Sequence, residues 1–201
     1  MTKRIRWVLA VFVLVGAAIL STGCLFNMFQ TARMLEAGDV GIVVGSGLID
    51  LAVDDDPVWT LTPQARLAFG LSDAVNLGLH TGAMIPLSTG DPGWMGVVGD
   101  LKFSLLNDPE SVSLAIGFGG GNGIHFIGWG VFGEVFLDLN VFPLYFAYQP
   151  TIPLSEAGFG VWHDVAIGLS LWISDSARLL LEVDTRNLGM WVYGLALEVS
   201  F

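Results

Sequence analysis

From Asp39 to the last residue, apolar and polar side chains alternate along the chain. The clearest run is 59–71, where Leu61 and Phe69 lie on one face and Gln64 and Arg66 on the other. A period of two places successive side chains on opposite faces of a β-strand. The run therefore predicts a strand with one apolar face and one face of small or polar residues.

Ten segments of this kind follow one another, most of them long enough for a tilted crossing of a bilayer. In three of them, 39–49, 123–137 and 140–152, both faces are so apolar that the phase stays uncertain. The remaining seven are 59–71, 75–85, 94–105, 112–119, 161–173, 179–184 and 191–201. The pattern predicts an all-β, antiparallel, up-and-down barrel of about ten strands, or of eight if two segments are loops.

The connections between these segments differ in length. The short turns are 71–73, 107–111, 138–140 and 174–176, and the longer connections are 50–58, 86–93 and 153–160. Bacterial outer-membrane barrels combine short periplasmic turns with longer outer loops. An even number of strands then puts both ends of the barrel on the periplasmic side.

The composition favours a transmembrane barrel. Apolar residues make up 53% of the 201 residues and charged residues 13%, about half the share in soluble domains. No run of 18 apolar residues follows position 24, which argues against a helical membrane bundle. The single cysteine excludes a disulfide scaffold. A soluble calyx remains the alternative, although its outer face would be more highly charged.

The first 23 residues have the pattern of a secretory signal peptide. Lys3, Arg4 and Arg6 precede an apolar stretch from 7 to 20, which is short for a membrane span. We therefore divide the chain into a signal peptide (1–23), a lead (24–38) and a barrel (39–201). The lead has one candidate helical turn, around Thr31 to Leu35, and the N-terminal segment is predicted to be helical.

The stretch Leu20-Ser21-Thr22-Gly23-Cys24 resembles the lipobox of bacterial lipoproteins. The resemblance implies a lipid on Cys24, although the leucine stands one place further from the cysteine than in the usual pattern. Ordinary signal cleavage, leaving a free Cys24, stays open. In similar lipoproteins an aspartate after the cysteine retains the protein at the inner membrane, whereas Leu25 here permits the outer membrane.

The C-terminus alternates up to a final aromatic residue. This end resembles the β-signal by which outer-membrane proteins are recognised for assembly, and strand addition explains how alternate side chains are read as a set. Over residues 39–201 the chain resembles the outer-membrane β-barrel superfamily, which implies the assembly machinery and outer-membrane lipids as partners. The signal consists of Tyr193, Leu195, Leu197, Val199 and Phe201.

Removal of residues 1–23 takes three of the eight basic residues and none of the 19 acidic ones, which leaves a formal charge of −14. Such a charge argues against nucleic acid as a partner, because a nucleic-acid surface needs a basic face.

Charged residues fall on the face opposite the large apolar side chains, so we expect them inside the barrel. Buried charges persist when they are paired or hydrated. The favoured interpretation is a charge network that fills the lumen of a structural or surface-exposed barrel. The alternative is a narrow, cation-preferring path, widened by inward glycines and narrowed by Trp94, Trp162 and Trp172. The set is Arg66, Asp100, Lys102, Glu134, Asp164, Glu182, Asp184, Arg186 and Glu198.

The three histidines are the candidates for catalysis. His80 is predicted to point inward, and His125 and His163 outward near strand ends. An outer-membrane lipid hydrolase is the second alternative, but no nucleophile-elbow motif is present. We expect no enzyme activity, no cofactor and no metal site.

Three outward tryptophans, Trp59, Trp129 and Trp191, fit the aromatic girdles that lie at lipid headgroup level in membrane barrels. Outward positions between them carry almost no charge, as contact with lipid requires.

Overall fold

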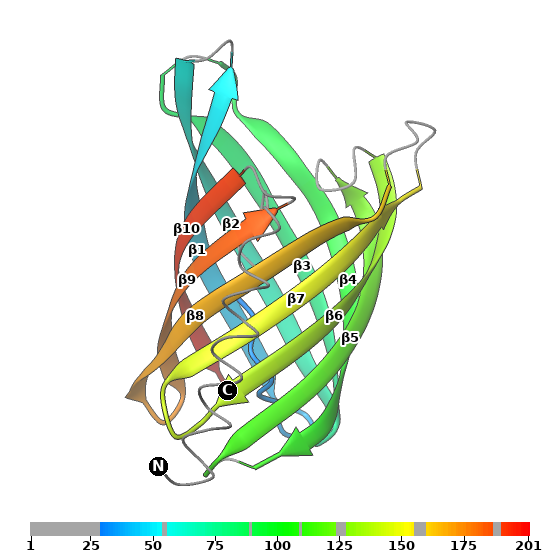
Figure 1. The fold of residues 1–201 in the computed structure, drawn as a ribbon. Coiled ribbons are helices and arrows are strands. Elements are labelled where there is room, and N and C mark those ends of the chain that lie inside the picture. The colour runs from blue at the N-terminus through cyan, green and yellow to red at the C-terminus, as the bar shows by residue number, and fades with distance from the viewer. Residues whose placement is uncertain are drawn as a thin grey trace, which may run out of the picture.

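The computed structural model describes residues 29–201 apart from 54–55, 89, 109, 124–127, 155–159 and 187–189. Ten strands form one closed barrel in which each strand pairs antiparallel with its neighbours in sequence, and the first pairs with the last (Figure 1). The predicted ten-strand, up-and-down barrel is confirmed. The strands are β1 Val40–Val53, β2 Asp56–Ser72, β3 Val75–Pro86, β4 Gly93–Asn107, β5 Val112–Gly123, β6 Gly128–Leu139, β7 Leu144–Pro153, β8 Trp162–Ser174, β9 Ala177–Arg186 and β10 Met190–Ser200.

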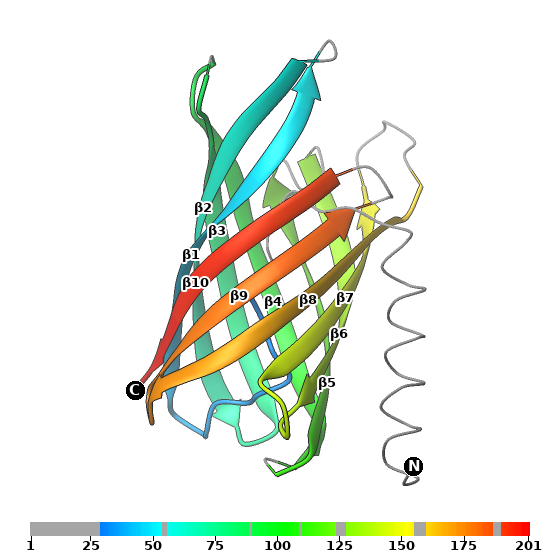
Figure 2. The same ribbon diagram turned by 60° about the vertical axis from the view of Figure 1, so that its left-hand side comes forward.

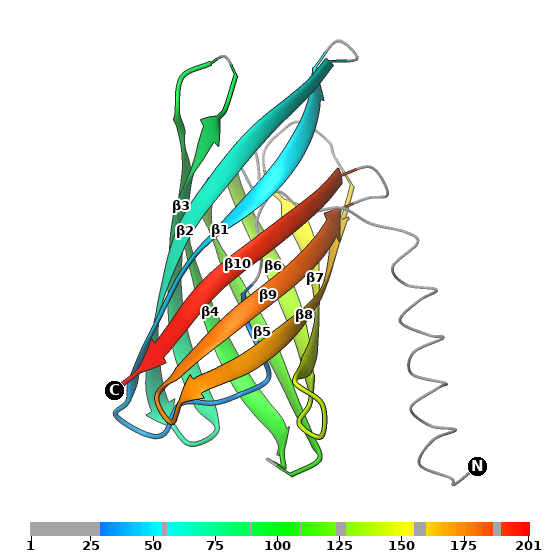
Figure 3. The same cartoon turned by 90° about the vertical axis from the view of Figure 1, so that its left-hand side faces the viewer.

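The barrel has two different ends (Figure 2). At the turn end, tight connections join β2 to β3, β4 to β5, β6 to β7 and β8 to β9. The start of β1 meets the C-terminus there, because Val40 and Phe201 exchange backbone hydrogen bonds of 3.0 and 2.9 Å. At the other end, the loop end, the β1–β2 hairpin extends beyond its neighbour β10 (Figure 3).

Burial follows the predicted alternation. In β2, Thr60 and Thr62 are fully buried on the inner face, whereas Trp59 is 44% exposed on the outer face. In β10, Leu195 and Leu197 are exposed outward and Ala196 is buried. An apolar outer wall around a polar interior is the arrangement of a membrane-spanning barrel, in which every backbone group is satisfied by a neighbouring strand. No helix in the described part of the chain is long and apolar enough to cross a membrane.

The first predicted loop, 50–58, is wrong. β1 and β2 pair as far as Val53 and Asp56, so most of this stretch is strand.

A bulge in β4 reverses the predicted direction of two side chains. Trp94 was expected inside and Met95 outside, yet Trp94 is 70% exposed and Met95 is fully buried. The register between β3 and β4 shifts beside Gly96, whose φ of 101° lies in the left-handed region. An extra residue on one strand exchanges the faces of the residues before it. Glycine at position 96 readily adopts the positive φ found in this bulge.

Inward glycines were expected to widen the lumen, but they make room for a large inward residue on the next strand. Gly168 lies opposite Tyr145, and a Cβ at Gly168 would come within 2.5 Å of the tyrosine ring. Gly117 lies opposite Glu134, and a Cβ there would be 2.4 Å from its Oε2. The space that a glycine leaves is therefore filled by its cross-strand partner.

Candidate functional site

Residues 29–38, which we call the inner segment, run inside the barrel as far as Leu35 and leave it through the exposed residues Glu36, Ala37 and Gly38. Phe29, Thr31 and Ala32 are between 1% and 2% exposed, and Met34 and Leu35 are also buried. The predicted helical turn around Thr31 to Leu35 is wrong, since the inner segment contains no helix. Its backbone groups bond to side chains of the barrel wall instead of to one another, which satisfies buried amides and carbonyls without a helix.

Three charged wall residues bind the backbone of the inner segment. Both carboxylate oxygens of Glu182 accept the Phe29 amide at 3.0 Å, and Asp138 Oδ1 accepts the Ala32 amide at 2.8 Å. Lys102 Nζ donates to the carbonyls of Thr31, at 3.0 Å, and Arg33, at 2.7 Å. Hydrogen bonds to charged groups are stronger than neutral ones, so β4, β6 and β9 hold this segment firmly.

Side chains of the inner segment add further polar contacts. Gln30 Nε2 donates to Glu134 Oε1 at 3.3 Å. Arg178 Nη2 donates to Thr31 Oγ1 at 2.8 Å, so the hydroxyl and the carbonyl of Thr31 are both held by wall residues.

Apolar contacts fill the space between these polar ones. Phe29 packs in a buried cluster with Val43, Tyr145, Leu180 and Ala196. Gly45 leaves room for this ring, because a Cβ there would lie 2.8 Å from Phe29 Cε2. A second cluster joins Ala32 and Met34 to four wall residues, Ala115, Phe136, Ala147 and Ala166.

The segment leaves the lumen at the turn end through a tight bend. Gly38 has a φ of 93° and donates its amide to the Gly70 carbonyl at 2.8 Å. The Ala37 amide donates to Asp73 Oδ1 at 3.2 Å in the β2–β3 turn. Gly70 is required for this path, because a Cβ there would lie 1.9 Å from the Glu36 carbonyl oxygen.

Two ion pairs flank the inner segment. Arg66 and Asp100 join β2 to β4 at 2.7 Å, and Arg178 and Glu198 join β9 to β10 at 2.7 Å. Gly78 stands directly opposite Asp100, where any Cβ would meet both charged groups of the first pair.

The structure thus separates the predicted charge set. Arg66 and Asp100 pair with each other, Lys102, Glu134 and Glu182 bind the inner segment, and Glu198 pairs with Arg178. Asp164 and Asp184 are fully buried in β8 and β9 nearer the loop end. The side chain of Arg186 lies outside the described residues.

Sequence reasoning missed two inward charges, Arg178 and Asp138. Arg178 is in phase with Leu180 and Glu182, and Asp138 is in phase with Glu134. Both stand next to a turn, so extending the alternation by two residues would have found them.

The inner segment leaves little space on the side that faces β1 to β4, β9 and β10. A cavity of about 20 Å³ remains between it and the wall of β1 to β4, β9 and β10, lined by Phe29, Gln30, Thr31, Arg33, Met34, Leu35, Gly41, Val43, Arg66, Ala68, Asn76, Lys102, Arg178 and Glu198. That volume accommodates about one water molecule. A wider, polar vestibule of about 550 Å³ opens at the turn end, where the Arg33 guanidinium stacks 4.4 Å from the Trp172 ring centroid.

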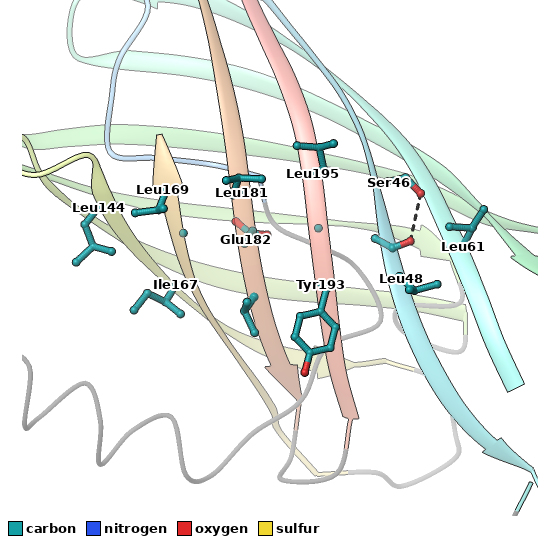
Figure 4. A pocket seen from close by; sticks show the side chains of 14 residues that line it. Ser46, Leu48, Leu61, Leu144, Ile167, Leu169, Leu181, Glu182, Tyr193 and Leu195 are labelled. Atoms are coloured by element: carbon teal, nitrogen blue, oxygen red, sulfur yellow. Dashed lines mark hydrogen bonds between the residues drawn. The ribbon is translucent and has the colours of Figure 1, made fainter. Parts of the chain in front are cut away.

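The outer wall has a shallow apolar hollow of about 730 Å³ across β7, β8, β9, β10, β1 and β2 (Figure 4). Leu169 and Leu195, which were expected to point outward, line it together with Tyr193. In a bilayer an apolar hollow of this kind is filled by acyl chains.

The remaining predicted positions fall as follows. Trp59, Trp129 and Trp191 are 43% to 64% exposed, and the outward residues of the C-terminal signal, Tyr193, Leu195, Leu197 and Phe201, are 43% to 73% exposed. Val199 is half-buried in the same strand and pairs with Ile42 of β1. Cys24 lies outside the described residues.

The described histidines are held by neighbouring side chains. His80 Nε2 and Gln64 Oε1 are 2.8 Å apart inside the barrel, and His163 Nδ1 lies 2.7 Å from the Tyr148 hydroxyl. His125 lies outside the described residues. Within the described part of the chain, no group of three or more His, Cys, Asp or Glu side chains is arranged to hold a metal ion.

No protein-family model and no curated protein matches the chain. Among solved structures, the N-terminal β-barrel domain of Pseudomonas aeruginosa OprF is 14% identical, with 83% of this chain and all of that one covered at a TM-score of 0.38. The outer-membrane protease OmpT from Escherichia coli is 11% identical, with 85% and 100% covered at 0.41. The KdgM porin is 8% identical, with 81% and 99% covered at 0.40. At these values none of them bears on what this chain does.

Proposed function

We propose that the protein is a bacterial outer-membrane barrel with a structural or surface-exposed role, and that its own inner segment closes the lumen. The observation that carries this proposal is the capture of the segment's backbone by Lys102, Asp138 and Glu182. These three residues come from three different strands, so the segment is held across the lumen and not along one wall.

The outer-membrane location is supported by the two surfaces of the barrel. The outer wall is apolar and the inner wall is polar, and such a barrel is stable only with lipid around it. We place the turn end and Phe201 in the periplasm, because outer-membrane barrels turn tightly there and carry longer connections outside.

Conductance tests the closure directly. We expect the refolded protein in a planar bilayer to show no steady current. The double variant Lys102→Met/Asp138→Asn removes two of the contacts to the backbone of the inner segment, and we expect it to open current steps. The variant Thr62→Val changes a buried inward residue towards the loop end and should stay silent. Steady current through the unaltered protein would overturn the proposal.

A narrow cation-preferring pore is the second candidate, and one observation favours it. Among the described inward wall residues, carboxylates outnumber basic side chains by seven to three. The basic residues are Arg66, Lys102 and Arg178. The carboxylates are Asp100, Glu134, Asp138, Asp164, Glu182, Asp184 and Glu198. Once the inner segment is displaced, such a lining favours cations. Reversal potentials under a salt gradient would show this preference in the double variant.

We also propose that Cys24 carries the lipid that the lipobox resemblance implies. Labelled palmitate should be incorporated into the protein and lost in Cys24→Ala.

A further inference from the structure

The wall of the lumen contacts the inner segment largely through main-chain atoms. Lys102 Nζ donates to two carbonyls of the segment, and Asp138 and Glu182 each accept one of its amides. Every residue except proline offers the same amide and carbonyl, whatever its side chain. This part of the wall is therefore a binding site for a polypeptide main chain, and the inner segment is the chain that occupies it.

Two positions of the site also select a side chain by its size. The ring of Phe29 lies where a Cβ on Gly45 would come within 2.8 Å of it, in a cluster of buried residues from the wall. Ala32 is 1% exposed and packs with Phe136 and three alanines of the wall. A larger side chain at position 32 would overpack this cluster. The site thus favours a chain in which an aromatic residue stands three positions before a small one.

The deep end of the site is acidic. Both carboxylate oxygens of Glu182 accept the Phe29 amide at 3.0 Å, and the Tyr145 hydroxyl donates to the same carboxylate at 2.8 Å. Further towards the loop end, Asp184 and Asp164 are fully buried. A carboxylate binds an ammonium group, with its charge and three donors, more strongly than an amide. A peptide that began at the position of Phe29 would place its N-terminal ammonium here.

The vestibule gives a peptide access to this site. It has a volume of about 550 Å³, borders Arg33 to Glu36 and opens at the turn end. Asp138 is the last residue but one of β6, near the turn end, whereas Glu182 is the sixth of the ten residues of β9. A chain that enters from the vestibule therefore meets Asp138 first and Glu182 last. In the orientation of the inner segment, its N-terminus leads.

We propose that the lumen is a binding site for the N-terminal end of a peptide, and that the inner segment occupies this site as a ligand attached to β1. The ligand class is a peptide with a free N-terminal ammonium, an aromatic first residue and a small fourth residue. The proposal rests on the closed lumen proposed above, and with the turn end in the periplasm the peptide comes from that side. Attachment gives the inner segment an effective concentration on the order of millimolar, so a free peptide competes poorly while the connection is intact.

Cutting the connection after folding tests the site. A specific protease site is inserted between the exposed residues Ala37 and Gly38 of the full-length protein, which is folded in detergent and then cleaved. A synthetic peptide of residues 29–37, with a fluorophore at its C-terminus, is present during cleavage, so the barrel never stands empty. We expect fluorescence anisotropy to show that the peptide replaces the cut segment. The uncleaved protein and a scrambled peptide of the same composition are the controls, and both should show little binding.

The N-terminus of the peptide tests the part assigned to Glu182. Acetylation turns the ammonium into an amide and should weaken binding about tenfold, as expected when a charged hydrogen bond becomes a neutral one. The barrel variant Glu182→Gln should lose this preference for the free N-terminus. The variant Thr62→Val, which changes a buried residue towards the loop end, should keep it.

Failure of the cleaved protein to take up the peptide would overturn the proposal, because the inner segment would then be a fixed part of the fold. Equal binding of the scrambled peptide would also overturn it, and equal binding of the acetylated peptide would remove the ammonium site. Current through the uncleaved protein would contradict the closed lumen instead. A silent uncleaved barrel that takes up no peptide after cleavage would leave the closed lumen standing and remove the peptide site alone.

Discussion

The two halves of the lumen differ in the polar groups that they bury and in the partners of those groups. In the turn-end half, charged wall residues bind the inner segment or each other, as Lys102, Asp138 and the Arg66–Asp100 pair do. In the loop-end half, the described wall residues include small hydroxyl groups such as Thr60 and Thr62, apolar side chains such as Ile49, and two buried carboxylates, Asp164 and Asp184. Most of the described inward charges thus lie in the half that holds the inner segment, where they bind its backbone, its side chains or each other.

Contacts with the inner segment explain why the turn-end half tolerates so many inward charges. A charge removed from water is costly unless it is paired and hydrogen-bonded. In the turn-end half, carboxylates accept amides and the lysine donates to two carbonyls, so the inner segment acts as the missing partner. A water-filled channel would need none of these contacts.

The largest expected effect comes from the Arg66–Asp100 pair. Arg66→Met leaves the buried Asp100 carboxylate without its cation, and breaking a buried pair costs roughly 3–5 kcal/mol. Urea unfolding of the refolded barrel measures this loss. The double variant Arg66→Met/Asp100→Leu removes both charges and should recover most of the stability. Equal instability of the single and double variants would show that the pair matters through packing.

Lys102→Met should have the next largest effect. The change leaves the buried carbonyls of Thr31 and Arg33 without their donor, at about 1–3 kcal/mol for each unsatisfied group. We expect a loss of about 2–4 kcal/mol in urea unfolding, together with faster proteolysis of the N-terminal segment. An unchanged unfolding midpoint would mean that the inner segment is held by its apolar contacts alone.

A matched pair of threonines compares the two halves directly. Thr31→Val removes the hydroxyl that accepts Arg178 Nη2 and should cost about 1.5–3 kcal/mol, as for a hydrogen bond to a charged group. Thr62→Val replaces a buried hydroxyl that has no partner among the described residues and should be neutral or slightly stabilising. Equal losses of unfolding free energy in the two variants would contradict the proposed difference between the two halves.

The smallest expected loss of unfolding free energy comes from a substitution where the inner segment leaves the barrel. Gly70→Ala puts a methyl group against the Glu36 carbonyl and should cost about 1–3 kcal/mol, as overpacking does. Gly133→Ala is the control, because the nearest atom to a Cβ there lies 3.7 Å away. The control should change the free energy of unfolding by less than about 0.5 kcal/mol. A harmless Gly70→Ala would mean that the segment takes another path.

The sequence by itself determined the barrel and the direction of most of its side chains. Alternation is a local property: once a segment is a strand, the period of two sets which face each residue occupies. The inward positions of Arg66, Lys102 and Glu182 were therefore predicted from their phase alone. Three of the four short turns were equally local, because polar residues mark them, whereas the turn predicted at 138–140 lies at 140–143, where three of the four residues are apolar.

Only the tertiary structure decided what the inward residues contact. The inner segment has no periodicity, and its path depends on Lys102, Asp138 and Glu182, which stand 70 or more residues away in the chain. The bulge at Gly96 and the glycines opposite large side chains also depend on neighbouring strands. Pairing across a closed barrel joins residues that are distant in the chain, and a local pattern carries no information about which of them meet.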